Sequence, residues 1–304
     1  MRIKTYAAAC GFALLSPLPP RAAPVELGAA EIIHRSVEAN ERDWQAGPSF
    51  SRLERDIETK GGEQTDHTYR VFLMDGSPYR RLVAVGGQPL SAARQKQEAQ
   101  KEGRELARRR AETPEERRQR IDRYKKDREH DHILMIQMES AFNFRLIGGD
   151  TLDGHPVYFL TAEPKPDYQP PSHEAKVLTG MKGRLWVDKA GFHWAKVEAE
   201  VVHPVTFAGF LARVGPGTRF MLEKEPVAEG IWEPRKFQAE VVASVLFWSK
   251  NSTTVNLFSD YRPNGAISGL PGAPRAADLQ LQRQKVQQVL QGENGDQLPM
   301  VHHH

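Results

Sequence analysis

The stretch MKGRLWVDKAGFHWAKVEAEVV, residues 181–202, decides the fold class. Two runs of alternating apolar and polar residues surround a central turn, Asp188-Lys189-Ala190-Gly191, which is typical of a β-hairpin. The second run is predicted to place on one face His193, Ala195, Val197, Ala199 and Val201. The other face carries mainly charged residues, so the hairpin predicts an antiparallel sheet with one polar face.

Similar runs recur on both sides of this hairpin. They predict strands at residues 49–59, 68–74, 79–85, 142–147, 157–162, 218–225, 231–248 and 251–261. About nine to eleven such strands cannot stay flat, because twist makes large open sheets curl. Residues 29–44 have the apolar spacing of an amphipathic helix. We therefore predict a mainly β fold with α elements: a curved, unclosed antiparallel β-barrel (half-barrel) with helices in or over its concave face and a protruding charged helical hairpin.

The protruding hairpin is predicted from a charged block. The chain of 304 residues has a net charge of +3, and residues 91–132 alone hold 14 basic and 10 acidic side chains. Thr113 suits an N-cap and Glu116 its reciprocal capping carboxylate, so two helices are expected, at about 91–111 and 114–140. Apolar residues are scarce there, which predicts projection from the body. Candidate contacts to lipid headgroups or a protein partner are Arg108, Arg109, Arg110, Arg117 and Arg118.

The N-terminal residues 1–23 have the pattern of a secretory signal peptide: two basic residues, an apolar run at 7–15 and then prolines. Lipidation of Cys10, the single cysteine, is the alternative. After cleavage no cysteine would remain, which excludes disulfides and thiolate sites. The expected organisation is a domain at 24–262 with an insertion at about 91–140, then a disordered or weakly helical tail at 263–304 in which His302–His304 resemble a tag remnant. We expect a periplasmic or outer-membrane-associated protein.

Two segments resemble a known superfamily. Gly183–Lys189 leading into Trp194–Glu198, and Gly230–Arg235, are similar to hairpins of the LolA-like superfamily of periplasmic lipoprotein carriers and outer-membrane lipoprotein-sorting proteins. The resemblance covers roughly residues 29–261. It implies an unclosed β-barrel with a helical lid over an apolar cavity that receives acyl chains. The charged block is not part of the basic carrier pattern, and no position matches the lid arginine of true carriers.

An apolar cavity on the sheet would be lined by nine residues: Leu185, Val187, Val197, Phe210, Leu211, Phe220, Phe237, Val241 and Val245. The spacing of Phe207, Phe210, Leu211 and Val214 predicts a short amphipathic helix that could serve as a lid. The alternative interpretation is that both sets simply form a packed core. A hollow concavity would favour the first interpretation and a filled one the second.

Catalysis receives no support from the motifs. Nucleophile-elbow, zincin, Walker and dinucleotide-binding patterns are absent from the sequence, and His130 and His132 point apart on a helix, so no catalytic residue, metal site or cofactor is predicted. Nucleic acid is an unsuitable partner because acids are interleaved with the basic residues. We expect a non-catalytic binding protein for a lipid acyl chain or lipoprotein, that is, a lipoprotein-sorting chaperone with peripheral membrane contact. The alternatives are an envelope scaffold or stress sensor that binds a protein through the charged hairpin, and an undetected hydrolase.

Overall fold

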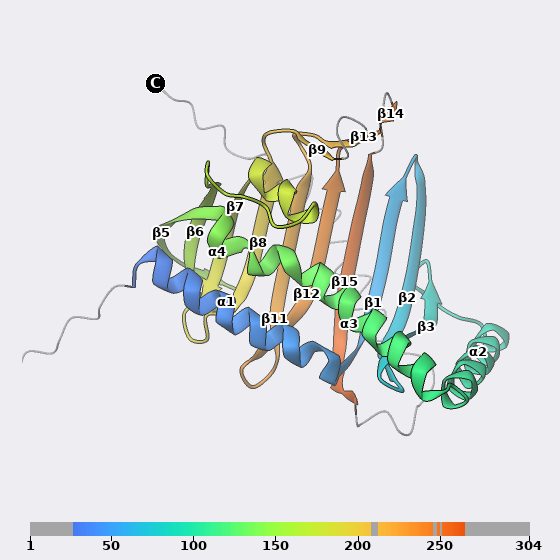
Figure 1. Ribbon diagram of the computed structural model, residues 1–304. Coiled ribbons are helices and arrows are strands. Elements are labelled where there is room, and N and C mark those ends of the chain that lie inside the picture. Colours follow the sequence, from blue (N-terminus) through green and yellow to red (C-terminus); the bar gives the residue numbers. More distant parts are fainter. Residues whose placement is uncertain (1–26, 208–211, 246–247, 250, 265–304) are drawn as a thin grey trace, which may run out of the picture.

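The computed structural model describes residues 27–264 except 208–211, 246–247 and 250 (Figure 1). The predicted signal peptide and tail lie outside these residues. Within them, one large sheet has eleven antiparallel strands in the order β4-β3-β2-β1-β15-β12-β11-β8-β7-β6-β5. These strands are β1 (Phe50–Lys60), β2 (Glu63–Met74), β3 (Ser77–Val85), β4 (Gln88–Pro89), β5 (Phe142–Leu152), β6 (His155–Pro164), β7 (Met181–Asp188), β8 (Trp194–Val201), β11 (Arg219–Ala228), β12 (Ile231–Val241) and β15 (Ser252–Pro263). Because β4 and β5 do not pair, the barrel stays open, and the predicted fold class is confirmed.

A second, small sheet has four strands in the order β14-β13-β10-β9: β9 (Val205–Phe207), β10 (Ala212–Val214), β13 (Ala243–Val245) and β14 (Trp248–Ser249). It corrects two predictions. The long strand expected at 231–248 is divided between the two sheets. The ends of the helix expected at 207–214 are strands, in which Phe207 pairs with Ala212 and Val205 with Val214. Phe207 and Val214 fall on one face of this antiparallel pair, so their spacing of seven does not distinguish the pair from a helix, and β-branched residues favour strand. Phe210 and Leu211 lie outside the described residues.

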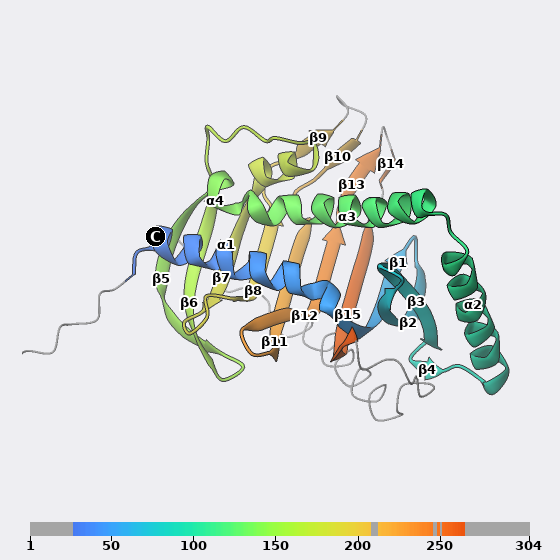
Figure 2. The same cartoon turned by 60° about the horizontal axis from the view of Figure 1, so that its bottom comes forward.

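Within the described residues, four helices accompany the large sheet: α1 (Ala29–Ala46), α2 (Ala92–Arg110), α3 (Pro114–Ile136) and α4 (Met138–Ala141), with short 3₁₀ turns η1 (Gly47–Ser49) and η2 (Glu174–Gly180). Figure 2 shows α1 and α3 running side by side across one face of the sheet, while α2 stands beyond its β3 edge. The predicted division at Thr113 is confirmed, including its capping box. However, α2 and α3 do not project as a free hairpin. Helix α3 lies over the sheet, and α2 is attached to the sheet by buried polar contacts.

The face that α1 covers can be followed strand by strand. Leu185 and Val187 of β7 pack against Ile32 and Ile33 of α1. Residues that are directly paired across strands share a face, so this face continues through Val197, Leu222, Phe237, Asn256 and Asp56. We call it the helix face, and the other the opposite face.

A register shift between Trp186 and Val187 changes the predicted alternation in β8. Trp194 pairs with Val187 and donates a hydrogen bond from Nε1 to Ser36 Oγ on α1 (3.1 Å), so it belongs to the helix face. Ala195 packs instead with Val157 and Trp232. One extra residue in a strand reverses the faces on one side of the bulge. The predicted grouping of Ala195 with Val197 is therefore wrong, whereas His193 still contacts α1 through Asp43.

Candidate functional site

The predicted lining residues fall into three groups. Leu185 and Val187 are 1 % and 0 % exposed and are sealed under α1. Four others are partly buried on the sheet: Val197, Phe220, Phe237 and Val241. Phe210 and Leu211 lie outside the described residues, and Val245 is placed only as part of strand β13. A ligand could therefore reach Leu185 and Val187 only if α1 left the sheet.

Partly buried apolar residues form a continuous patch in the middle of the helix face. Val197, Leu222 and Phe237 pair across β8, β11 and β12, and Ala199, Phe220 and Ala239 pair in the adjacent row. We call these six residues the central strip. Only Ala239 among them is classed as buried, and the two alanines leave room between larger side chains. Two large apolar side chains of α3, Leu134 and Ile136, are also 37 % and 44 % exposed. The middle of the helix face is thus apolar and incompletely covered.

A recess of about 850 Å³ opens where strands β1, β12 and β15 end, next to the central strip. Val241 and Val242 supply apolar surface, and Val242 is 39 % exposed. The remaining lining is polar or glycine: Thr59, Lys60, Gly61, Gly62, Gly217, Glu240, Asn251, Ser252 and Thr253. Its size is in the range of small-molecule sites, which combine apolar walls with a few polar groups. Among the predicted residues, Val241 lines it.

A buried ionic centre attaches α1 to the sheet. Asp43 accepts hydrogen bonds from Lys224 Nζ (2.5 Å), His193 Nδ1 (3.0 Å) and the backbone N–H of Trp232 (2.9 Å). Lys224 also donates to Asn40 Oδ1 at 2.9 Å. Burial acts to raise the pKa of Asp43, but the hydrogen bond from His193 and the charge of Lys224 outweigh it and lower that pKa. Burial also lowers the pKa of Lys224. Every member is paired inside the protein, which favours a structural role.

One carboxyl near this centre is poorly satisfied. Glu233 lies beside Gly47 at the end of α1, and its Oε1 has no hydrogen-bond partner. Burial raises the pKa of Glu233 to about 7, against the lowering effect of Lys224 and Arg52. The side chain can therefore change charge near neutral pH.

A separate group of contacts, which we call the clasp, joins α3 to the end of α1. The Trp44 ring stacks on His132 with centroids 4.2 Å apart, and the Arg128 guanidinium lies 4.3 Å from the Trp44 ring centroid. Arg128 also donates to the Trp44 carbonyl, and His132 Nε2 lies 2.6 Å from Glu41 Oε2. His132 thus interacts with a carboxylate of α1, and the side chain of His130 lies outside the described residues.

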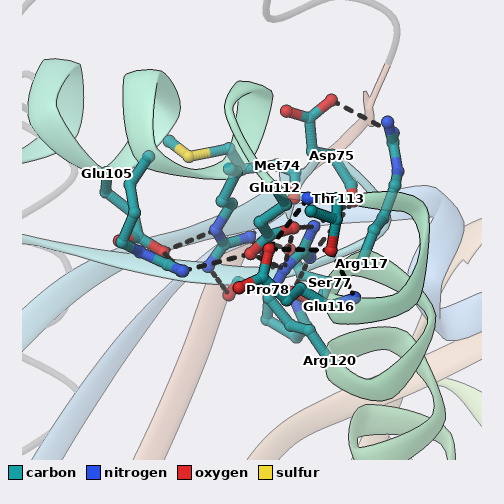
Figure 3. A network of polar contacts seen from close by, with 12 residues as sticks. Met74, Asp75, Ser77, Pro78, Glu105, Glu112, Thr113, Glu116, Arg117 and Arg120 are labelled. Carbon is teal, nitrogen blue, oxygen red and sulfur yellow. Dashed lines mark hydrogen bonds and ion pairs between the residues drawn. The ribbon is translucent and has the colours of Figure 1, made fainter.

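The β2–β3 turn is the docking point for α2 and α3 (Figure 3). Its residues Asp75 and Gly76 both have positive φ, as a two-residue type I′ hairpin turn requires. Arg109 donates to the carbonyls of Met74 (2.6 Å), Ser77 (2.9 Å) and Pro78 (3.1 Å). Arg120 donates to Ser77 Oγ at 2.7 Å and to the Asp75 carbonyl. Arginine guanidinium groups thus satisfy a turn that would otherwise expose several carbonyls.

The acidic partners of these arginines are also partly buried. Hydrogen bonds from Arg108 and Arg109 lower the pKa of Glu105 to about 2. Arg109 is only 6 % exposed, so its prediction as a partner contact is wrong: its guanidinium already binds the turn. The other four predicted arginines are exposed: Arg108, Arg110, Arg117 and Arg118.

Acidic and basic side chains lie on different sides of α2. The four acids of residues 91–112 have side chains only 6–23 % exposed: Glu98, Glu102, Glu105 and Glu112. Each is paired with a cation of the fold. Six basic residues are exposed, and we call them the basic face: Arg94, Lys96, Lys101, Arg104, Arg108 and Arg110. The sequence predicts only interleaved charges, because the sequence alone does not show which side of α2 faces the sheet.

Sequence reasoning missed the ionic centre, the clasp and Glu233. A signal for the first was present, since Ser36, Asn40 and Asp43 recur at spacings of 4 and 3 on the stripe that also carries Ile33. Polar residues on an apolar stripe predict buried partners. No helix in the described part of the chain is both long and apolar enough to span a membrane.

Comparison with known proteins gives matches only among solved structures; no family model and no curated protein matches the sequence. The chain is similar to a LolA superfamily protein from Nitrosomonas europaea at 14 % identity and TM-score 0.32, over 81 % of this chain and 96 % of that one. It is similar to a domain described as an outer membrane lipoprotein-sorting protein from Vibrio parahaemolyticus at 13 % identity and TM-score 0.31, over 79 % and 95 %.

A third similar structure is MucB in complex with MucA from Pseudomonas aeruginosa, at 12 % identity and TM-score 0.23, over 75 % of this chain and 98 % of that one. Identity and TM-score are low in all three cases.

Proposed function

We propose that this chain is an exported, non-catalytic binding protein that holds a lipid acyl chain, free or on a lipidated polypeptide, against the central strip. The carrying observation is that the middle of the helix face is apolar, continuous over three strands and incompletely covered. Burying acyl carbons there gains about 0.8 kcal/mol per CH₂. No covalent chemistry is needed for reversible holding of this kind.

The recess at the ends of β1, β12 and β15 suits the polar end of such a ligand. Val241 and Val242 continue the apolar surface to this edge, where Lys60 provides a cation and Ser252 and Thr253 provide hydroxyls. The carboxylate of Glu240 also lines the recess and accepts a hydrogen bond from Gln238. A phosphate or carboxylate headgroup would be matched by the ammonium and hydroxyl groups. The acyl chain would then extend from the recess along the strip.

Binding of a fluorescent fatty-acid probe tests this function. Phe237→Asn places an amide in the strip and should weaken binding about tenfold or more, because apolar contact is lost and a polar group is buried. Phe159→Asn is the matched control, since Phe159 adjoins the buried Leu160 in β6 and therefore points to the opposite face, stacked on Trp186. Equal affinities of the two variants, or repeated recovery of lipid-free protein from a membrane-containing host by native mass spectrometry, would refute the proposal.

A second candidate function is protein binding through the basic face, as in an envelope scaffold or stress sensor. The specific observation in its favour is that all four acids of residues 91–112 have largely buried side chains, which leaves mainly basic side chains on the exposed side of α2. Such a surface would steer an acidic partner electrostatically.

Cross-linking in an envelope extract tests this candidate. The Lys96→Glu/Arg104→Glu variant should lose a specific cross-linked partner while keeping fatty-acid binding. The control is Lys182→Glu, an exposed lysine on β7. The candidate fails when the basic-face variant and the control retain the same partners.

A further inference from the structure

An apolar patch lies on the opposite face of the sheet, on β1 and β15. Ile57, Val255 and Leu257 cluster there, and Leu53 lies on the same face of β1, four residues before Ile57. Asp56 and Asn256 belong to the helix face, and neighbours along a strand alternate, so Ile57, Val255 and Leu257 point the other way. We call these four residues the opposite-face patch.

This patch is too deeply buried for an open sheet surface. Its four side chains are between 0 % and 9 % exposed. In Figure 1 the described helices α1, α3 and α4 lie on the helix face, and α2 lies beyond the β3 edge. Among the described elements, therefore, no helix or strand covers the patch. A central strand with one face open to water keeps its side chains on that face partly exposed, so something must lie over it.

Two polar groups beside the patch also lack partners. Arg55 forms a bidentate pair with Asp66, at 2.8 and 2.6 Å, but its Nη1 has no partner although the side chain is only 6 % exposed. Thr68 is 0 % exposed and its Oγ1 is likewise unpaired. Buried donors of this kind are normally satisfied, so the covering group should bring acceptors such as backbone carbonyls or side-chain amides.

We propose that residues 276–292 of the same chain dock on the opposite-face patch as an amphipathic helix. The chain leaves the sheet at Pro263, and Asn264 donates to the Pro48 carbonyl. Leu257 lies six residues back along β15, about 20 Å at ~3.3 Å per residue. The eleven residues 265–275, rich in Gly and Pro, can span up to about 36 Å when extended. The tether therefore reaches the patch with length to spare.

The segment has the composition that the patch requires. Leu279, Val286 and Leu290 fall on one helical stripe, and the glutamines around them offer both donors and acceptors. A 17-residue helix is about 26 Å long and can cross several strands spaced ~4.8 Å apart. Residues 265–304 hold three basic and three acidic side chains, so docking would be driven by apolar contact instead of net charge.

Photo-cross-linking in the full-length chain tests the proposal. With p-benzoylphenylalanine at Val255, irradiation should join this position to a peptide within residues 276–292 of the same molecule. The matched control places the same group at Thr254, the adjacent residue on the helix face, which should not form that product. A cross-link between two molecules, which would identify a second copy as the cover, or the absence of any cross-link to 276–292, overturns the proposal.

A second pair of full-length variants avoids altering the sheet. Val286→Asp places a charge on the docking stripe, and Gln288→Asp places the same charge on the opposite side of the helix. The first should lower the Tm by about 5 °C and expose the patch to an apolar dye, while the second should leave both nearly unchanged. Equal effects of the two substitutions would contradict docking through this stripe.

Discussion

Replacement of Arg109 tests whether this buried arginine of α2, unlike its exposed neighbours, stabilises the fold. The side chain is 7 % exposed and donates to three carbonyls of the β2–β3 turn as well as to Glu105 at 2.6 Å. Arg109→Met keeps the length of the side chain but removes every one of these donors. The carbonyls of Met74, Ser77 and Pro78 would then face an apolar group.

The expected loss in free energy of unfolding follows from these contacts. Removing one member of a buried hydrogen-bonded ion pair typically costs about 3–5 kcal/mol, because the partners stay buried without compensation. Arg110→Met is the matched control: it makes the same change of charge and volume on an exposed side chain of the same helix. Its expected effect is within about 0.5 kcal/mol of the wild type.

Urea unfolding of both variants measures these free energies of unfolding, and hydrogen exchange by mass spectrometry reports whether α2 leaves the turn without global unfolding. We expect Arg109→Met to lower the free energy of unfolding by the larger amount, or to remove protection in α2 and β3 selectively. The reasoning is refuted if the two variants are equally stable and equally protected in α2.

Three further predictions concern α1 and the clasp. The pKa of Glu233 in the folded protein is about 7, above its usual 4.5, so its protonated side chain stabilises the fold fully below pH 4.5. About 3 kcal/mol of the free energy of unfolding is lost as the pH rises through 7. Glu233→Gln should abolish this pH dependence of stability, measured by urea titrations at pH 4.5 and 8. Asp43→Asn should cost about 3–5 kcal/mol by leaving Lys224 unpaired, and adding Lys224→Met should recover much of that loss in the same assay; no recovery would contradict the pairing. Arg128→Ala should speed uptake of the fatty-acid probe in stopped-flow measurements severalfold, and an unchanged rate would exclude α3 as the moving element.

The strands were predictable because their signal is local. Alternation and turn residues place the hairpin turns at Asp75-Gly76 and at residues 188–191, and the capping residues Thr113 and Glu116 place the start of α3. These features depend on residues within a few positions of one another. The eleven strands of the large sheet accordingly agree with the predicted number.

The position of the helices was not predictable in the same way. Glu105 and Arg109 satisfy the i,i+4 rule for solvated helices, yet the same spacing holds the pair against a turn more than 30 residues earlier in the chain. The ionic centre joins Asp43 to Lys224 across 181 residues, which no periodicity within one element can reveal. Pattern reasoning identifies what each segment can form but not which long-range partner satisfies its polar groups.

The two helices that cross the sheet are attached by different physical means, and this bears on how a ligand would enter. Moving α1 would expose Ile32, Ile33 and the apolar residues beneath them and would also separate the buried pair of Asp43 and Lys224. Much of the attachment of α3 comes from polar contacts near its ends, at the β2–β3 turn and at Trp44, while Leu134 and Ile136 remain exposed. Separating a packed apolar core and a buried ion pair, as at α1, costs more free energy than replacing the partly hydrated polar contacts of α3 with water. If the central strip receives an acyl chain, α3 is therefore the element that should lift, with α1 as the fixed support.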